Sequence, residues 1–380
     1  MKLIVNKDKL NSSIQQVSKA ISSRTTIQIL GGIKVDAHTQ GITLTASDTD
    51  ISIQSTIPPQ DGDTELFTIE QEGAVVLPAK FFVDIIRKLP EDTVEIEVKD
   101  GFQTMIRSGL SEIQLVGMDA EEYPLLPSMD VKEMVMMQSD LLKTMIRQTI
   151  LAVSTQESTP ILTGVLFNIQ EEHIKLIATD RHRLATREAS IRNDEGIDFN
   201  NIVISGKNLN ELQKLLPDQD TIIEIVRADN QVLFNLGTVQ FFTRVLDGIY
   251  PDTSKIIPQS YKTEMVVPAK PFLSAMDRVN LLSREERTNI VKMATLEDGK
   301  IEISSSSSEL GRITEQLDLP SISGEPLKIS FNSRYMLDAL KTIDSEWIHL
   351  GFTGAMSPII VKPKDETFQL HLILPYRTTG

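Results

Sequence analysis

The feature that most constrains the fold of this chain is an internal repeat. Each of its three copies is about a third of the chain in length. Residues 77–90, 204–217 and 329–341 each combine a short strand, a small or polar position suited to begin a helix, and one amphipathic helix. The starts of these segments are 127 and 125 residues apart. A solenoid unit has about 20–50 residues, so each copy is expected to be a domain rather than a solenoid repeat.

A second helix and a hairpin-like pair of strands recur in the same order in each copy. Chance similarity between helices of an α+β protein is the alternative, but it does not explain the constant order. We therefore predict an α+β chain of three similar domains, each with two helices and antiparallel sheets. The six helices are predicted at 6–24, 78–89, 139–154, 205–216, 268–284 and 331–343.

The joints between the copies are also related. Residues 118–127 and 246–258 are both rich in proline, which favours extended connectors over a continued helix. Domains are accordingly predicted at 1–127, 128–258 and 259–380. Three such domains form an arc whose ends can meet in a head-to-tail ring, and the residues alone leave open whether two or three chains close it.

Length and composition agree with several domains in a reducing compartment. The 380 residues exceed the size at which single cores stop growing. The absence of cysteine excludes disulfides and thiolate chemistry, which fits a reducing cytosol. The first residues lack the apolar core of a signal peptide, and no window approaches 18 apolar residues. We expect a soluble cytoplasmic protein.

The net charge of −15 argues at first against a nucleic-acid partner. The predicted helices, however, contain sixteen Lys and Arg against six Asp and Glu, so they carry +10 and the rest of the chain −25. Solvated helix faces are the alternative explanation. The bias has the same sign in all six helices, which predicts a basic surface that attracts phosphates without reading sequence. Its candidate DNA-binding residues are Lys7, Lys9, Arg24, Lys80, Lys143, Arg147, Lys207, Lys270 and Arg278.

No catalytic or metal-binding motif is present. The five histidines have no partner at helical metal-site spacing, and no HExxH, GxSxG, GxGxxG or GxxxxGK[ST] occurs. The serine run at 304–308 is better explained as an edge strand with a loose turn than as a phosphate nest. We therefore expect no catalytic residue, no metal and no cofactor, although an enzyme of unrecognised type remains an alternative.

One charged cluster interrupts an apolar strand, at residues 178–185. A tight turn between two strands explains its polar residues without any function. The functional interpretation is a polar rim beside exposed apolar residues, namely Leu162, Leu184 and the chain end at 372–377. A free C-terminal strand there would leave aliphatic and aromatic surface uncovered, as in a peptide-binding groove.

Four segments together resemble the bacterial DNA polymerase III beta-subunit family, the replicative sliding clamps. They are residues 179–184, residues 250–258, residues 374–377, and Arg24 before residues 29–31. The resemblance spans the whole chain. It implies the DNA-clamp fold, a head-to-tail homodimer forming a ring around duplex DNA, helices lining the pore, sheets forming the outer wall, and a non-catalytic processivity role. It also implies that Arg24 contacts DNA.

The resemblance further implies a peptide groove used by the replicative polymerase, the clamp loader, repair polymerases and mismatch-repair proteins. Two positions depart from the family pattern, because Arg181 stands where a small residue is common and Tyr376 where methionine is common. The groove residues carried over are Leu162, Thr179, Arg181, His182, Arg183, Leu184, Pro251, Lys255, Ile256, Leu372, Leu374, Pro375, Tyr376 and Arg377.

Two further expectations remain to be tested. A strand near residues 105–107 is expected at a sheet edge, where it could pair with one near residues 301–304 of the next chain. The rival from another functional class is a scaffold protein that binds peptides but not DNA, with basic helices that are merely solvated.

Overall fold

The structure is a computed structural model of the whole chain, and it describes residues 1–22, 25–126, 134–193, 196–218, 220–228, 230–285, 289–307 and 309–377. The chain divides into two compact units, which are described separately. Unit 1 comprises residues 1–140, 192–197 and 210–245, and unit 2 comprises residues 141–191, 198–209 and 246–380. None of the helices in the described residues is long and apolar enough to cross a membrane.

Six α-helices occur among the described residues, all within the predicted ranges or one residue beyond them. The predicted helix at 6–24 was too long, because its α-helical part ends at Val17 and a 3-10 turn, Ser18–Ala20, follows. The predicted helix at 139–154 likewise changes to a 3-10 turn at Ile150–Ala152. The helices are α1 (Lys7–Val17), α2 (Ala79–Lys88), α3 (Ser139–Thr149), α4 (Gly206–Gln213), α5 (Ala269–Glu285) and α6 (Ser333–Leu340).

Unit 1 contains two antiparallel sheets. The five-stranded sheet has the order β11 (Ser111–Val116), β10 (Gln103–Ser108), β9 (Thr93–Val98), β1 (Lys2–Asn6) and β7 (Phe67–Gln71). The eight-stranded sheet has the order β12 (Met134–Gln138), β17 (Ile222–Ala228), β18 (Gln231–Asn235), β19 (Val239–Arg244), β4 (Ile51–Ile57), β3 (Gly41–Ser47), β2 (Gly32–His38) and β8 (Gly73–Pro78). A small ribbon joins β5 (Gln60–Asp61) to β6 (Thr64–Glu65).

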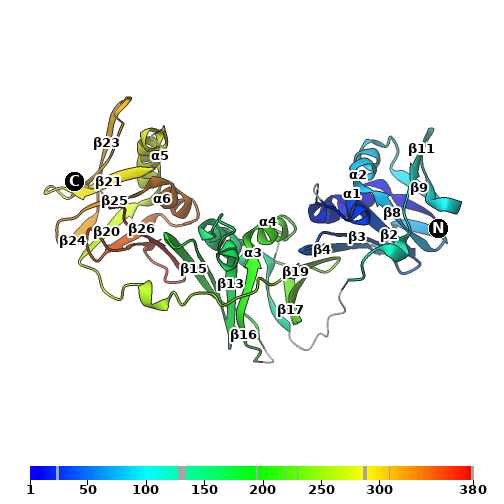
Figure 1. The fold of residues 1–380 in the computed structure, drawn as a ribbon, viewed down its shortest axis with the longest axis horizontal. Helices are drawn as coiled ribbons and strands as arrows, with labels where there is room; N and C mark the ends of the chain where they lie inside the picture. Colours follow the sequence, from blue (N-terminus) through cyan, green and yellow to red (C-terminus); the bar gives the residue numbers. More distant parts are fainter. Residues whose placement is uncertain are drawn as a thin grey trace. The chain divides into compact units, whose positions relative to one another are not determined.

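Unit 2 also contains two antiparallel sheets. The nine-stranded sheet has the order β16 (Phe199–Ser205), β13 (Gly164–Gln170), β14 (His173–Thr179), β15 (Arg183–Ser190), β28 (Gln369–Ile373), β27 (Ile359–Pro363), β26 (Trp347–Phe352), β20 (Thr263–Pro268) and β24 (Ser321–Gly324). The four-stranded sheet has the order β23 (Gly311–Asp318), β22 (Lys300–Ser307), β21 (Ile290–Thr295) and β25 (Lys328–Asn332). Figure 1 shows the helices α5 and α6 beside these strands.

Helix α5 covers one face of the four-stranded sheet with an apolar stripe. In α5 the buried residues Phe272, Ala275, Met276, Val279 and Ser283 follow helical spacing. They pack in a core that includes Ile301 and Ile303 of β22 and Met336 of α6, so α5 packs against both the sheet and its neighbouring helix. The predicted class of α+β domains with helices on antiparallel sheets is confirmed.

The two large sheets each join strands from different thirds of the chain. Strand β4 pairs antiparallel with β19 in unit 1, and β15 pairs antiparallel with β28 in unit 2. Both sheets therefore pass across the predicted boundaries at 127 and 258, and the middle third contributes strands to both units. The division into three domains stays a prediction.

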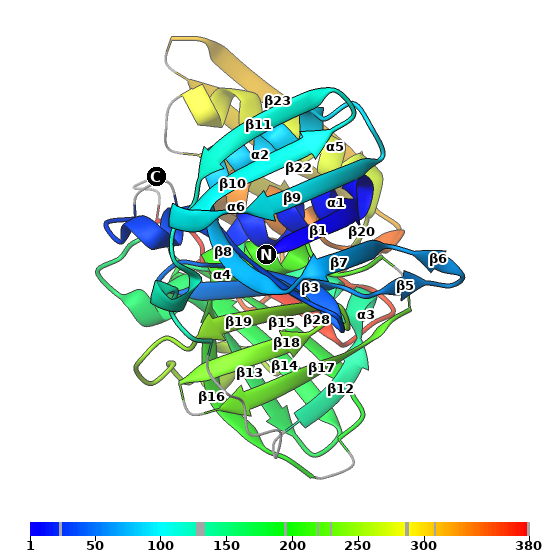
Figure 2. The ribbon, with the colours of Figure 1, turned by 90° about the vertical axis from the view of Figure 1, so that its right-hand side faces the viewer.

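Both strands that were expected at sheet edges lie one strand in from the edge. Strand β10, which contains residues 105–107, lies between β9 and β11, and β22, which contains residues 301–304, lies between β21 and β23. Figure 2 shows β11 outside β10 and β9 in its sheet. The edge strands next to β10 and β22 are β11 and β23. The edge-strand explanation for the serine run is therefore wrong as well, because Ser304 to Ser307 belong to β22, which lies between β21 and β23. Ser308 lies outside the described residues.

Candidate functional site

The charged cluster predicted at residues 178–185 is the tight turn between β14 and β15. The carboxylate oxygen Oδ1 of Asp180 accepts hydrogen bonds from the backbone N–H groups of His182 and Arg183, both at 2.9 Å. Arg181 has a φ of 77°. This left-handed conformation is uncommon for a residue with a Cβ atom, which gives a physical reason for a small residue at the position.

Arg183 ties this turn to helix α6. Its Nε atom lies 3.0 Å from Asp180 Oδ2 and its Nη1 atom 2.7 Å from Asp338 Oδ2. The guanidinium also lies 4.4 Å from the ring centre of Tyr335, a cation–π distance. Its side chain is only 13% exposed. Arg183 is therefore a fixed wall of the site rather than a mobile surface charge.

A buried tyrosine holds the same turn by a hydrogen bond. The hydroxyl of Tyr250 accepts a hydrogen bond from the backbone N–H of Thr179 at 3.0 Å, and the Thr179 hydroxyl donates to the Arg183 carbonyl at 2.7 Å. Burial raises the pKa of Tyr250, which stays protonated. The predicted residue Pro251 follows it and is exposed.

Three leucines of the predicted groove that were expected to be exposed are buried. Leu162, Leu184 and Leu372 are 3%, 1% and 1% exposed, because they belong to one buried cluster with Ile360 and Tyr250. They form the support beneath the surface. Of the apolar residues predicted for the groove, Ile256 at 45%, Leu374 at 38% and Tyr376 at 54% have exposed side chains.

The C-terminal strand was predicted to be free, and that prediction is wrong. Strand β28 lies between β15 and β27, with Leu372 opposite Leu184. Beyond it, the backbone N–H of Leu374 donates to the His182 carbonyl at 2.9 Å, and the N–H of Tyr376 donates to the Ser330 carbonyl at 2.7 Å. The chain end is thereby held against both the turn and strand β25. The side chains of Leu374, Tyr376 and Arg377 remain exposed.

Lys255 and Ile256 lie in a short 3-10 turn, Ser254–Ile256. The carboxylate of Asp252 accepts hydrogen bonds from the Ser254 backbone N–H and hydroxyl at 2.9 and 2.7 Å. These bonds lower the pKa of Asp252, so the carboxylate stays ionised and holds the turn. The turn presents Lys255 and Ile256 to solvent.

A pocket of about 370 Å³ opens beside the Asp180 turn. Of the predicted residues, Leu162, Arg181, His182 and Arg183 line it, whereas Pro251, Ile256 and the chain end do not. The Arg181 guanidinium donates to Thr159 Oγ1 at 3.2 Å across its rim. Sequence reasoning missed the lining residues Asn289, Asn332, Arg334 and Tyr335 as site residues. No local signal marks them, since they reach the turn only through the tertiary fold.

The described DNA-binding candidates lie on helices α1 to α5, and several are already paired. Lys9 forms an ion pair with Asp61 at 2.6 Å, Arg278 with Glu315 at 2.7 Å, and Arg147 with Asp344. Lys7 donates to the Leu89 carbonyl at 3.3 Å. The pairing raises the pKa of Arg278 and fixes its charge. Arg24 lies outside the described residues.

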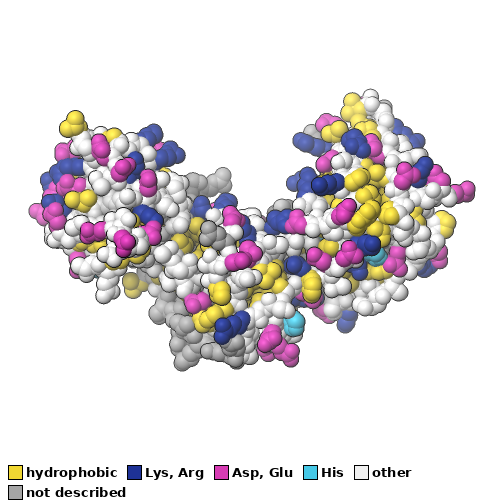
Figure 3. Space-filling model, turned by 180° about the vertical axis from the view of Figure 1, so that it is seen from behind, with side chains coloured by type: hydrophobic (Ala, Val, Ile, Leu, Met, Phe, Trp, Pro, Cys, Tyr) yellow, Lys and Arg dark blue, Asp and Glu magenta, His cyan; other side chains and the backbone are white. Residues whose placement is uncertain are grey.

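Three other predicted cations have no acidic partner among the described residues. Lys80 on α2, Lys207 on α4 and Lys270 on α5 form no ion pair with a described residue, and Lys80 lies 5.7 Å from the Phe81 ring centre. Lys143 lies on α3. Figure 3 shows Lys and Arg beside Asp and Glu on the visible face of the molecule.

The charge contrast is smaller than predicted. Within the observed bounds, the described α-helices hold twelve Lys and Arg against seven Asp and Glu, a net +5. Lys19, Lys214 and Lys341 fall outside those bounds.

Comparison with known proteins decides the family. The family models for the N-terminal, central and C-terminal domains of the DNA polymerase III beta subunit match residues 1–127, 136–252 and 254–377. The chain belongs to the DNA polymerase III beta-subunit family. Members of this family are sliding clamps, non-catalytic processivity subunits, and the predicted function as a DNA sliding clamp is confirmed at that level.

Relatives from two genera cover the whole chain. The beta sliding clamp of Bacillus subtilis is 50% identical over 379 residues, covering 100% of both chains, and that of Staphylococcus aureus is 43% identical over 378 residues, again covering 100% of both. The crystal structure of the DNA polymerase sliding clamp from Bacillus subtilis matches with a TM-score of 0.97 and 49% identity, covering 100% of this chain and 99% of that one. Among the described residues no group of three or more His, Cys, Asp or Glu is arranged to hold a metal.

Proposed function

We propose that two copies of this chain close head to tail into a ring around duplex DNA and tether DNA polymerase III through a peptide groove. The observation that supports the proposed ring is the pattern of strand pairing between successive copies of the internal repeat. Within the chain that pattern occurs twice. The two strands that would continue it, one toward each end of the chain, are paired on one side only among the described strands.

The equivalent strands follow from the order of elements. Strands β4, β15 and β23 each end the hairpin that follows the first helix of a copy, and β11, β19 and β28 each end a copy. Strand β4 pairs with β19 and β15 with β28, both antiparallel. The remaining pair, β23 and β11, would complete the series between two chains. Such a contact joins two different surfaces, so it generates a ring where its rotation closes.

The neighbours of these edges support burial in an interface. On α2, beside β11, Phe81 is 54% exposed, and it lines an apolar pocket of about 260 Å³ with Ile85 and Ile113. On α5, which packs against β23, Leu281 is 62% exposed. Exposed apolar side chains beside an unpaired strand edge are a liability in a monomer and are expected in an interface.

The groove is proposed at the surface carried by Ile256, Leu374 and Tyr376 over the buried residues Leu184 and Leu372. Its support is rigid, because Arg183 and Tyr250 hold the Asp180 turn, and its exposed side chains are apolar, as a hydrophobic peptide requires. Its proposed users are the replicative polymerase, the clamp loader, repair polymerases and mismatch-repair proteins. A cytoplasmic location, where these partners act, fits the cysteine-free sequence.

Solution mass tests the ring directly. We expect sedimentation velocity to give twice the 42.4 kDa of one chain. Leu281→Asp places a charge in the proposed interface and should weaken self-association by at least about tenfold, whereas Leu125→Asp, at another exposed leucine, should not. A monomer or trimer, or equal behaviour of the two variants, would contradict the proposed dimer.

A further inference from the structure

The outward face of the four-stranded sheet in unit 2 carries a row of side chains that begins at the chain end. Pro375 forms a bridge with Phe331, so Tyr376 lies opposite Ser330 on β25. Ser330 is opposite Lys292 on β21, and Lys292 is opposite Ser304 on β22. Directly opposed residues of antiparallel strands share a face, with Cβ atoms about 4.5–5.5 Å apart. Tyr376 and Lys292 are therefore linked by one short row.

A second row lies beside the first. It runs from Lys328 on β25 through Ala294 on β21 to Glu302 on β22. Helix α5 covers the opposite face of this sheet, where Met293, Ile303 and Ile329 are buried. Both rows are therefore directed away from the core. We refer to Tyr376, Ser330, Lys292, Ser304, Lys328 and Ala294 as the outer strip.

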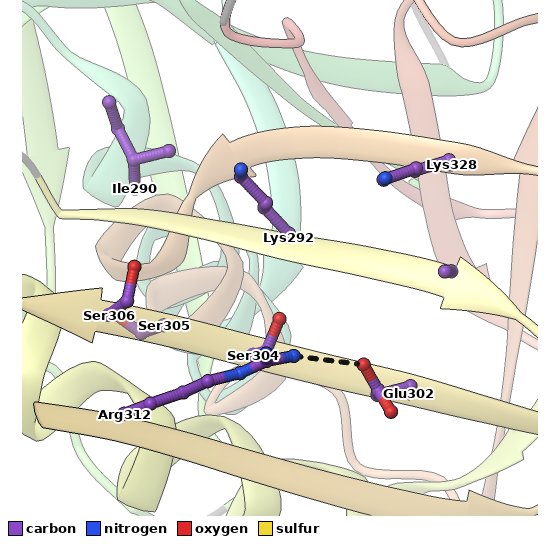
Figure 4. Close-up of a pocket in the computed structure, with 9 residues that line it drawn as sticks. Ile290, Lys292, Glu302, Ser304, Ser305, Ser306, Arg312 and Lys328 are labelled. Carbon is purple, nitrogen blue, oxygen red and sulfur yellow. Dashed lines mark hydrogen bonds and ion pairs between the residues drawn. The ribbon is translucent and has the colours of Figure 1, made fainter. Parts of the chain in front are cut away.

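The outer strip is hollow and positively charged. Residues Lys292, Lys328, Ser304 and Ala294 line a pocket of about 420 Å³, together with Ser306, Arg312 and Glu302. Figure 4 shows Lys292 and Lys328 on neighbouring strands, with Ser304, Ser306, Glu302 and the long side chain of Arg312 beside them. Arg312 is engaged, since it lies 3.5 Å from Glu302 and donates to Thr314 at 3.0 Å.

Lys292 and Lys328 are left without a counter-charge. Both are exposed, and neither forms an ion pair with any residue in the described part of the chain. The serine hydroxyls of Ser304 and Ser306 can donate hydrogen bonds to an oxyanion between the two lysines. A site with two free ammonium groups, hydroxyl donors and space for several atoms is suited to carboxylates.

We propose that the outer strip binds acidic residues that flank the hydrophobic segment of a partner peptide held in the groove. This inference rests on the proposed groove, which it extends past Tyr376. An acidic peptide fits better than nucleic acid, because only two cations of the pocket, Lys292 and Lys328, form no ion pair with a described residue. Nucleic-acid binding draws its affinity from many phosphate contacts.

The probes are synthetic peptides that share one segment containing two leucines and a phenylalanine. In one pair of peptides, that segment is followed by a run of glutamates or by a matched run of glutamines. In the second pair, the same runs precede the segment. Fluorescence anisotropy with the full chain measures their affinity at about 50 mM and about 500 mM NaCl, where the Debye length falls from roughly 14 to roughly 4 Å.

We expect one glutamate peptide to bind about three- to tenfold more tightly than its glutamine match at low salt, with the difference lost at high salt. The double substitution Lys292→Gln and Lys328→Gln should abolish the difference and leave the glutamine peptide unchanged. The matched control, Lys362→Gln with Lys364→Gln, removes the same charge from strand β27 and its following turn and should preserve it. Equal affinities in the native chain, or a difference that survives the first double variant, would overturn the proposal.

A per-residue readout separates failure of the strip from failure of the groove. Limited acetylation followed by mass spectrometry measures how far each peptide protects Lys292 and Lys328 relative to Lys362 and Lys364. If the glutamine peptide does not bind at all, the groove assignment is wrong. Protection of Lys292 and Lys328 by the glutamate peptide then tests the outer strip independently of the groove. Lack of that protection refutes the strip. Protection of the same lysines by duplex DNA, and not by the glutamate peptide, would assign the strip to nucleic acid and also refute it.

Discussion

His371 belongs to a buried polar network in unit 2. It is 1% exposed, and its Nε2 atom accepts a hydrogen bond from Gln369 at 2.9 Å. Gln369 and Thr342 in turn contact Gln148 of helix α3, with both distances 3.2 Å. The network thus links the middle and last thirds of the chain through neutral groups. Burial, aided by the positive charge of Arg183, lowers the pKa of His371 to about 3.

A depressed histidine pKa makes the stability of unit 2 dependent on pH. Below the ordinary value of 6.5, the unfolded chain takes up a proton that the folded chain refuses, so stability falls as the pH drops from 6.5 toward 3. The slope reaches about 1.4 kcal/mol per pH unit. Between pH 7.5 and 5, native protein should lose about 2 kcal/mol more stability than His371→Gln.

The single tryptophan provides the measurement. Trp347 lies on β26, in the same sheet as His371, so its fluorescence reports urea unfolding of that sheet. The two proteins are compared at both pH values. Equal losses in the native chain and the variant would show that His371 does not control this dependence.

At the scale of single residues, the residue types and their order predicted the Asp180 turn but not the burial of the leucines beside it. The polar residues of the Asp180 turn follow from its composition, and the left-handed conformation of Arg181 explains why a small residue is common there. Leu162 and Leu184 were predicted to be exposed, yet they are covered by Leu372 and Ile360 from nearly 200 residues later in the chain. Local sequence contains no information about such contacts.

The helices differ in how much free positive charge they offer to DNA. Lys207 and Lys270 form no ion pair with a described residue, whereas Lys9 and Arg278 are paired with Asp61 and Glu315. A cation that already has a carboxylate partner adds less to a phosphate contact. The charge relevant to DNA is therefore smaller than the number of basic residues indicates.

Replacing the two free lysines should weaken sequence-independent binding to duplex DNA more than replacing two paired cations. If both contact phosphates, Lys207→Gln with Lys270→Gln should reduce the slope of log affinity against log salt by up to about 2. The matched control is Lys9→Gln with Arg278→Gln. Fluorescence anisotropy with a short duplex checks both, and an unchanged slope in the first variant would favour helices that are merely solvated.

The chain end forms a separate element beyond strand β28. Deleting residues 374–380 leaves β28 intact, because that strand ends at Ile373 and is paired on both sides. Loss of the exposed side chains Leu374 and Tyr376 should reduce affinity for a hydrophobic peptide by at least about tenfold without changing the sedimentation coefficient.

The control deletion removes residues 378–380 alone and should retain binding. Peptide affinity that survives the longer deletion would refute the groove. Failure of that variant to sediment like the native chain would instead assign the chain end to assembly.

Periodicity predicted the helices because an apolar stripe at helical spacing is a local property. The edges of the sheets could not be predicted in the same way. Strands β10 and β11 both alternate, as do β22 and β23, and only their pairing shows which one lies outside. Likewise, β28 resembled a free terminal strand because its partner β15 is far away in sequence.

At the scale of the whole molecule, the internal repeat describes how the sequence is divided, whereas the compact units describe how the strands are joined into sheets. The repeat divides the sequence into thirds, whereas the sheets join one third to the next through β4–β19 and β15–β28. The same pairing applied once more, from β23 to β11 of a second copy, gives a closed assembly. Net charge was a poor guide to partners, because −15 is a sum over basic helices and a more acidic remainder.

A closed ring keeps DNA by topology, so its contacts can be weak enough to permit sliding. The direct measurement is retention of this protein on a nicked circular duplex after loading, before and after the circle is cut. We predict that the protein remains on the intact circle and leaves when the DNA is linearised. Equal loss from the circular and linear forms would contradict encirclement and leave a protein that binds peptides without enclosing DNA.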